Sequence, residues 1–323
     1  MKPASFPFLF LSLLMLSGCD RDTCCDDPAE ETSFEAPAPL EFTDIQENAR
    51  NTSRQEIQFN AEEGITFTSD NGTVLQIAPG CLSVGAGEPV SGNVTLQFTE
   101  LYNHGDMLAS GKPTTGLTAT EERAFLVSGG IFYINIIQNE QQITNNCGTQ
   151  LQVPVSLTGG PDQDMILWNG MEDDNGIFIW QPDPQGELFV ENDRYVTFFS
   201  GGPGWVGIAR PRDFAEPKTG LRVLVTEGYN AENASVYIAY SGEKHGLAQL
   251  PAFDAETNVF SDPFRQIPRD REVHLIFVSA DSGLWRYAIK NVTTGKNQVY
   301  TIAYSETTTA TLEELLSVIG ELP

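Results

Sequence analysis

Histidine and carboxylate side chains in this sequence have the chemistry for catalysis or metal binding. The three histidines, His104, His245 and His274, lie far apart in the chain and lack the spacing of metal ligands. The 44 acidic residues allow a carboxylate pair for glycoside hydrolysis, but no spacing singles out one pair. The sequence contains no HExxH motif, no phosphate-binding loop and no Gly-x-Ser-x-Gly elbow. We therefore expect no enzyme and no cofactor, and glycoside hydrolysis stays open.

Calcium is the one metal that the acidic turns suggest. Nine acidic residues and no basic residue lie between Asp162 and Asp193. The EF-hand pattern fails there, because placing Gly176 at its sixth position puts Pro182, not glutamate, at the twelfth. Acidic turns are more often only solvated, so we expect no metal site. The weak calcium candidates that remain are Asp162, Asp164, Asp173 and Asp174.

Four tryptophans raise the question of a sugar-stacking surface. Trp168 and Trp180 each end an apolar run, which is typical of core residues or of packing between domains. We therefore expect core packing. The alternative is an exposed platform that combines a carboxylate with tryptophans chosen from Trp168, Trp180, Trp205 and Trp285.

The N-terminus carries the chemistry of a lipid anchor. Lys2 precedes an apolar run over residues 6–16, which is shorter than the roughly 20 residues of a membrane span. The run ends in Leu16-Ser17-Gly18-Cys19, which resembles the lipobox of bacterial lipoproteins. The resemblance implies that residues 1–18 are a cleaved signal peptide and that the Cys19 thiol takes a diacylglyceryl group. Membrane contact is expected through this lipid alone.

An acidic segment follows the predicted anchor. Residues 20–41 contain eight acidic residues and one basic residue, and Pro28, Pro37 and Pro39 are expected to prevent a helix. We therefore predict that residues 19–55 form an extended, solvated tether. The acidic patch resembles the surface-export signal of Bacteroidetes-type lipoproteins, which implies outer-membrane attachment and exposure on the bacterial cell surface. Retention at the inner membrane, signalled by Asp20, is the alternative.

Four further cysteines lie in the oxidising space that the anchor implies. Cys81 and Cys147 each occupy a turn of the same predicted domain, so we expect a disulfide between them, with two buried free thiols as the alternative. Cys24 and Cys25 lie in the predicted tether, and their pairing stays open.

Residues 56–160 alternate apolar and polar side chains in short runs separated by turns, which predicts a β-sandwich. A resemblance to the sandwich domain of ankyrins and netrin receptors is carried by Asn71-Gly72-Thr73-Val74-Leu75-Gln76-Ile77-Ala78-Pro79-Gly80-Cys81-Leu82 and by residues 89–96. Residues 107–114 and 126–130 resemble a pattern of Bacteroidetes-type envelope lipoproteins. These resemblances imply an interaction fold and no chemistry.

The remainder of the chain predicts two more β-rich parts. Residues 161–217 contain apolar strand-like runs and are expected to form a small bridging β-unit. Residues 218–323 contain about seven strands, the number of an immunoglobulin-like sandwich. Thr311 and Glu314 form a capping box that begins a short C-terminal helix. The predicted fold class is all-β, with two β-sandwich domains, the second Ig-like, and a bridging unit between them.

The net charge of the chain limits the classes of partner that we expect. Lys and Arg number 18 against 44 Asp and Glu, which gives a formal net charge of −26. Such a chain lacks the basic face that nucleic acids require, so no nucleic-acid partner is expected. The sequence predicts a lipid-anchored cell-envelope protein that acts as a non-enzymatic interaction or structural module on an envelope protein or glycan. Glycan binding or glycan processing at the cell surface is the alternative function.

Overall fold

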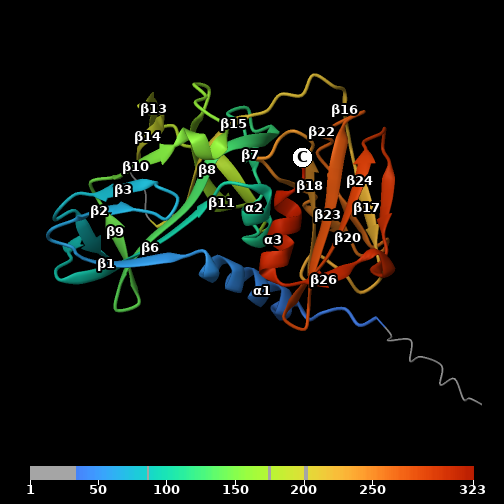
Figure 1. Ribbon diagram of the computed structural model, residues 1–323, viewed down its shortest axis with the longest axis horizontal. Coiled ribbons are helices and arrows are strands. Elements are labelled where there is room, and N and C mark those ends of the chain that lie inside the picture. Colours follow the sequence, from blue (N-terminus) through green and yellow to red (C-terminus); the bar gives the residue numbers. More distant parts are fainter. Residues whose placement is uncertain (1–33, 86, 174–175, 200–202) are drawn as a thin grey trace, which may run out of the picture. The chain divides into compact units, whose positions relative to one another are not determined.

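A computed structural model of the protein describes residues 34–323, except for 86, 174–175 and 200–202. Residues Glu35–Pro323 form one compact unit, and most of its elements are strands (Figure 1). The predicted all-β class is confirmed at this level. The lipobox with Cys19, together with Cys24 and Cys25, lies outside the described residues.

Five strands form an antiparallel sheet: β2 (Ile65–Thr68), β3 (Val74–Ile77), β10 (Thr149–Pro154), β13 (Glu187–Glu191) and β14 (Arg194–Phe199). Their order across the sheet is β13-β14-β10-β3-β2. Successive side chains point alternately to the core and to the solvent, as the period of two in these strands predicts.

A second, larger sheet packs against the five-stranded sheet, and the first hydrophobic core lies between the two. Its strands are β1 (Gln55–Asn60), β4 (Leu82–Val84), β5 (Glu88–Pro89), β6 (Asn93–Leu101), β7 (Thr115–Leu117), β8 (Arg123–Gln138), β9 (Gln141–Asn145), β11 (Ile166–Glu172), β12 (Phe178–Pro182) and β15 (Gly204–Pro211). The longest is β8, with 16 residues, and it pairs with β6, β7, β9 and β15. Fully buried side chains such as Leu75, Phe98 and Phe132 pack in the core between the two sheets.

Five strands of the larger sheet close into a ring, which we call the β-ring. The strands β7, β8, β15, β11 and β12 pair in that order, and β12 pairs again with β7. Trp168 and Trp180 share the inward face and are 1% and 2% exposed. A Cβ at Gly116 would lie 2.9 Å from the Trp168 ring, and one at Gly207 would lie 3.1 Å from the Trp180 ring. Glycine at these positions therefore makes room for two indoles inside a narrow ring.

The expected bridging unit over residues 161–217 does not form a separate body. Its strands β11, β12 and β15 belong to the larger sheet, and its strands β13 and β14 extend the five-stranded sheet. Leu167 and Ile208 are buried in the same core as Leu75. The reason is physical: short strands cannot bury both faces alone, so they pair with strands that already have a core.

The C-terminal part adds two main sheets and one short pair. One sheet has the order β20 (Ala252–Asp254), β21 (Val259–Ser261), β17 (Arg222–Val225) and β25 (Val299–Ile302). The other has the order β19 (Ala248–Gln249), β18 (Ala234–Tyr240), β23 (Glu272–Asp281), β24 (Leu284–Thr293) and β26 (Thr308–Ala310). The short pair is β16 (Lys218–Thr219) with β22 (Ile267–Pro268), and 3₁₀ turns lie at Val155–Thr158 and Tyr304–Glu306.

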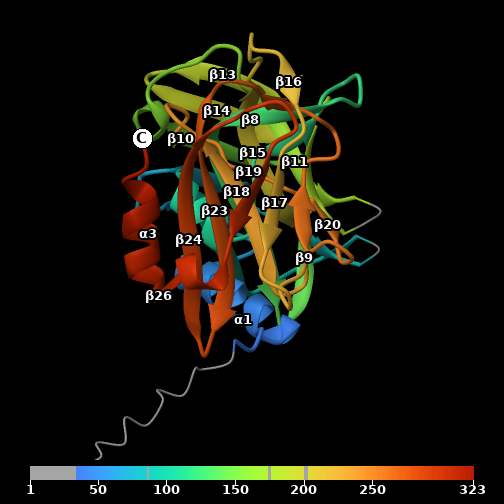
Figure 2. The ribbon, with the colours of Figure 1, turned by 90° about the vertical axis from the view of Figure 1, so that its right-hand side faces the viewer.

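The C-terminal helix α3 (Leu312–Gly320) follows the sequence prediction. Thr311 accepts a hydrogen bond from the Glu314 amide, and the Glu314 carboxylate accepts one from the Thr311 amide, so the capping box is present. Leu315 and Ile319 are buried on one side of the helix, which lies beside β24 (Figure 2).

The helix α1 (Pro39–Thr52) contradicts the predicted tether. Pro39 stands in its first turn, where proline is tolerated because the missing N–H would have no helical partner. Phe42, Ile45 and Ala49 recur at helical spacing and are buried. The prediction of an extended segment through residue 55 was therefore wrong for residues 39–52.

A second core joins the two halves of the chain. It contains Phe42 of α1, Leu108 of α2 (His104–Ala109), Trp168 of the β-ring, Tyr237 of β18 and Leu315 of α3. The Thr114 amide also donates to the Leu247 carbonyl at 2.7 Å, and the Ser128 amide donates to the His245 carbonyl at 2.8 Å. Core packing and main-chain hydrogen bonds therefore cross the boundary expected after residue 217.

Candidate functional site

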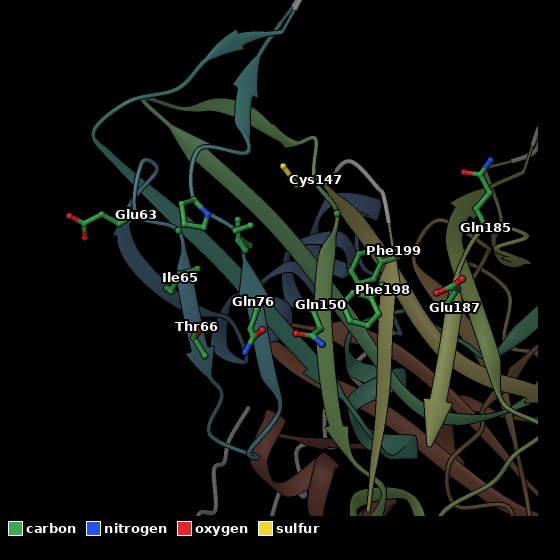
Figure 3. Close-up of a pocket in the computed structure, with 15 residues that line it drawn as sticks. Glu63, Ile65, Thr66, Gln76, Cys147, Gln150, Gln185, Glu187, Phe198 and Phe199 are labelled. Carbon is green, nitrogen blue, oxygen red and sulfur yellow. The ribbon is translucent and has the colours of Figure 1, made fainter. Parts of the chain in front are cut away.

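The outer face of the five-stranded sheet presents an unbroken row of side chains. The strand register places Thr66, Gln76, Gln150, Phe198 and Glu187 opposite one another on β2, β3, β10, β14 and β13. Opposed residues of neighbouring strands share a face, so this row crosses the whole sheet. Figure 3 shows these five side chains side by side.

A second row lies two residues further along each strand, on the same face. It contains Thr68, Val74, Gln152, Val196 and Phe189. Phe189 and Phe198 are diagonal neighbours on adjacent strands and are 47% and 48% exposed. Two large aromatic side chains side by side in solvent mark a surface that a ligand can cover. We call the two rows together the outer sheet face.

A groove of about 650 Å³ extends from the first row to the end of the sheet. Cys147 and Gly148 line it, and Cys147 forms a disulfide with Cys81, with 5.5 Å between the two Cα atoms. Cys81 follows β3 and Cys147 precedes β10, and these strands are paired neighbours. The disulfide expected from the sequence therefore ties together the strands that carry Gln76 and Gln150.

The two rows of the outer sheet face offer hydrogen bonding and apolar contact and contain no basic residue, and Arg194 lies two residues before Val196 on the same side of β14. The side chains of Gln76 and Gln150 make no hydrogen bond to the described part of the chain, so each amide keeps its donors and acceptor for a ligand. The exposed phenylalanine rings supply flat apolar area. Glu63 and Glu187 line the groove and disfavour an anionic ligand.

Two of the weak calcium candidates, Asp162 and Asp173, form ion pairs with arginines. Asp162 forms an ion pair with Arg210, and its other oxygen accepts the Asp164 amide at 2.9 Å. Asp173 forms an ion pair with Arg123 at 3.0 Å. Asp174 lies outside the described residues. Within residues 34–323, leaving aside the gaps named above, no three His, Cys, Asp or Glu side chains group as metal ligands.

The tryptophans do not form a sugar platform. Trp168, Trp180 and Trp285 are at most 2% exposed, and only Trp205 is half-buried. The indole N–H of Trp168 donates to the Ala209 carbonyl at 2.9 Å, and that of Trp180 donates to the Pro113 carbonyl at 2.8 Å. The expectation of core packing is confirmed for Trp168 and Trp180. The platform alternative was wrong because three of the four indole rings are buried in cores, so no two tryptophans share an exposed surface.

The fold brings His245 and His274 within electrostatic range of His104, although the three are far apart in sequence. The His104 ring Nε2 lies 2.8 Å from the Glu243 carbonyl, and the His245 ring Nδ1 lies 2.8 Å from the Tyr102 carbonyl. Burial lowers the pKa of His104 and of His274, which favours their neutral forms near pH 7. His104 and His245 thus join main-chain segments of the two halves.

Sequence reasoning identified three of the five strands of the outer sheet face, β3, β10 and β14, but it missed the edge strands β2 and β13 and the site itself. The alternation around Gln76 and Gln150 already placed both amides on a solvent face. Phe198 belongs to the apolar run Tyr195-Val196-Thr197-Phe198-Phe199, which reads as a buried strand. Strict alternation through Tyr195 and Thr197 inward was the signal that Phe198 points outward.

The chain matches no protein-family model and no curated protein. In the part of the chain that the structure describes, none of the helices has the length and apolar character needed to span a membrane.

Proposed function

We propose that this protein is a lipid-anchored, non-enzymatic interaction module of the bacterial cell envelope, attached to the outer membrane and exposed on the surface. Its body combines a first β-sandwich with a second, Ig-like one. The lipobox-like residues ending at Cys19 support the anchor, and the acidic residues behind it support export. The observation that carries the interaction role is the outer sheet face with its two exposed phenylalanines.

The outer sheet face suits an extended partner better than a small reactive one. It is crossed by a row on five strands, and its groove is open at the end of the sheet that carries the disulfide. An extended protein segment or glycan chain can lie across such a row and contact rings and amides together.

Retention of the protein on envelope material tests this role. We expect the double variant Phe189→Ser, Phe198→Ser to bind isolated envelopes about tenfold more weakly, because two exposed anchoring rings are lost. The matched control is Val299→Ser, which removes a 48% exposed apolar side chain from a different sheet. Equal retention of both variants and the wild type would remove the outer sheet face as the interaction site.

A glycan is the second candidate ligand of this face, and the unbonded amides beside the rings favour it. Gln76→Leu with Gln150→Leu removes donors and acceptors but keeps the apolar area. A neutral oligosaccharide should lose about tenfold in affinity through these substitutions, because sugar hydroxyls depend on such hydrogen bonds. A protein partner that packs on the rings should bind the same variant at least as well.

The anchor has its own test. Cys19→Ala removes the thiol that accepts the diacylglyceryl group, so the variant should take up no labelled fatty acid and should leave the membrane fraction. Labelled lipid on the variant would contradict the anchor, whatever the outer sheet face binds.

A further inference from the structure

A cleft of about 1200 Å³ lies where α1, the β-ring and β18 meet. Thr43, Gln46, Arg50 and Arg54 line it from the side of α1. Its opposite walls include Tyr237 of β18 and residues of the β-ring. We call it the ring-mouth cleft, because it opens at one end of the β-ring.

The β-ring contributes an aromatic wall to this cleft. Phe178 and Trp205 lie two residues from the inward-facing Trp180 and Gly207, on the same face of their strands. Phe178 meets Trp180 edge to face with 5.1 Å between ring centres, and Trp205 meets Tyr133 with 5.2 Å between ring centres. The mouth of a small β-barrel is a common place for a ligand site.

Three basic residues, Arg50, Arg54 and Lys112, line the ring-mouth cleft together with Glu172 and Glu232, and none of the three forms an ion pair with a described carboxylate. Lys112 Nζ lies 4.1 Å from the centre of the Phe178 ring and 5.4 Å from that of Trp205. Arg50 donates to the Ser110 carbonyl, and the buried Arg54 Nε has no hydrogen-bond partner. No described carboxylate lies within 4.0 Å of their nitrogens, whereas Arg123 and Arg210 elsewhere form such pairs.

Burial of the cations in this cleft disfavours their charged forms. Arg50 interacts electrostatically with both Arg54 and Lys112, and Glu47 and Glu172 offset this repulsion only from outside pairing distance. Burial lowers the pKa of Arg50 and, with repulsion from Arg50, lowers that of Lys112 to about 8. Three cations in one cleft, without an ion pair to any carboxylate that the structure describes, are an arrangement that an anionic ligand would complete.

We propose that the ring-mouth cleft binds an acidic sugar chain, meaning a saccharide that carries carboxylate or sulfate groups. This site is separate from the outer sheet face and does not depend on what that face binds. The volume exceeds that of one inorganic ion and allows several sugar units. The cations receive the acidic groups, Tyr133 and Trp205 contact sugar rings, and Gln46 and Gln249 hydrogen-bond hydroxyl groups.

Calorimetric titration of the full mature protein in detergent tests the proposal. The probes are a galacturonate hexasaccharide, a sulfated hexasaccharide, uncharged maltohexaose and a hexaglutamate peptide. At low salt, we expect at least one acidic saccharide to bind at least about tenfold more tightly than maltohexaose and hexaglutamate. Equal binding of hexaglutamate would overturn the assignment to sugar, and equal binding of maltohexaose would overturn the role of the cations.

Paired variants locate the binding. Arg54→Gln with Lys112→Gln should weaken the acidic saccharide by at least about tenfold, because two charge-assisted contacts are lost. The control Lys218→Gln with Arg222→Gln removes the same charge from the C-terminal part of the chain and should change affinity less than about twofold. A similar loss in both pairs would reduce the effect to net charge and overturn the site.

A third variant guards against misfolding of the first. Thr43→Glu places a carboxylate in the cleft from an exposed position of α1 and leaves all three cations in place. It should fold as the wild type does and bind the acidic saccharide about tenfold more weakly, because like charges now meet. Unchanged affinity in this variant would contradict the proposal.

Discussion

The outer sheet face and the ring-mouth cleft differ in the charge of the side chains that line them, although both belong to one acidic chain. The face presents amides and phenylalanines between glutamates. The cleft presents three cations, Arg50, Arg54 and Lys112, beside Glu172 and Glu232, and no carboxylate in the described residues forms an ion pair with these cations. The face is built from neighbouring strands whose register alone sets the row. The cleft is built from α1, the β-ring and β18, which are far apart in sequence. The net charge of the whole chain therefore does not predict the charge of an individual binding site.

The two regions are also held differently. The Cys81–Cys147 disulfide lies at the end of the outer sheet face, whereas the α1 wall of the cleft is held by the packing of Phe42, Ile45 and Ala49. Changes to one support should therefore leave the other region intact, because they act through separate cores.

Loss of the disulfide should have the largest effect. Cys81→Ser with Cys147→Ser opens a link between residues 66 positions apart, and we expect the free energy of unfolding to fall by about 4 kcal/mol from chain entropy. Urea unfolding of the variant and of the wild type, each with and without reductant, measures this. A wild type that loses nothing on reduction would show that the bond is absent or without effect in solution.

Removal of the buried Phe42 side chain, which packs α1 onto the body of the protein, should have the second-largest effect. Phe42 is 4% exposed and meets Trp285 edge to face with 6.4 Å between ring centres. Phe42→Ala should lower the free energy of unfolding by about 3 kcal/mol and expose α1 to protease. The matched control Leu40→Ala, at a 68% exposed position of the same helix, should change little. Cleavage within residues 39–52 of the wild type at the same rate would contradict the packed helix.

Titration of Lys112 should produce a smaller, pH-dependent effect. Burial lowers the pKa of Lys112 from the ordinary lysine value of 10.5 to about 8 in the folded protein, so the unfolded chain binds more protons between these pH values. Burying the charged lysine lowers the free energy of unfolding, and this destabilisation is full below pH 8 and disappears as the pH rises toward 10.5. Titratable groups that line the same cleft are Arg50, Arg54, Tyr133, Glu172, Glu232 and Tyr237.

We therefore expect the wild type to gain stability relative to Lys112→Met between pH 8 and 10, by at most about 1.4 kcal/mol per pH unit. Urea unfolding of both proteins at several pH values measures the difference between their free energies of unfolding. Groups that titrate in both proteins contribute equally to the two values and drop out of this difference. A difference that is flat with pH would show that Lys112 keeps an ordinary pKa and is well solvated.

Chelation should have the smallest effect. Asp162 and Asp173 already pair with Arg210 and Arg123, so EDTA should leave the melting temperature unchanged. A fall in melting temperature that calcium restores would turn Asp162, Asp164 and Asp173 into ligand candidates and would give the chain a cation site beside its proposed anion site.

The sequence by itself determined those features that depend on neighbours along the chain. Alternation predicts the strands around Gln76 and Gln150, the Thr311–Glu314 capping box predicts α3, and the turn positions of Cys81 and Cys147 suggest their pairing. Each is a local property, because backbone geometry repeats every two or 3.6 residues.

Only the tertiary structure decided how these elements combine. Composition suggested a tether over residues that in fact form α1, with Phe42, Ile45 and Ala49 buried. The sequence could not reveal this helix, because a helix gains most of its stability from packing on a partner, and the sequence does not show that partner. Ring closure through β8 and β15, and the meeting of Arg54 with Lys112 in one cleft, likewise depend on contacts between distant segments. Such contacts follow from which apolar faces find each other during folding, and no local pattern records that choice.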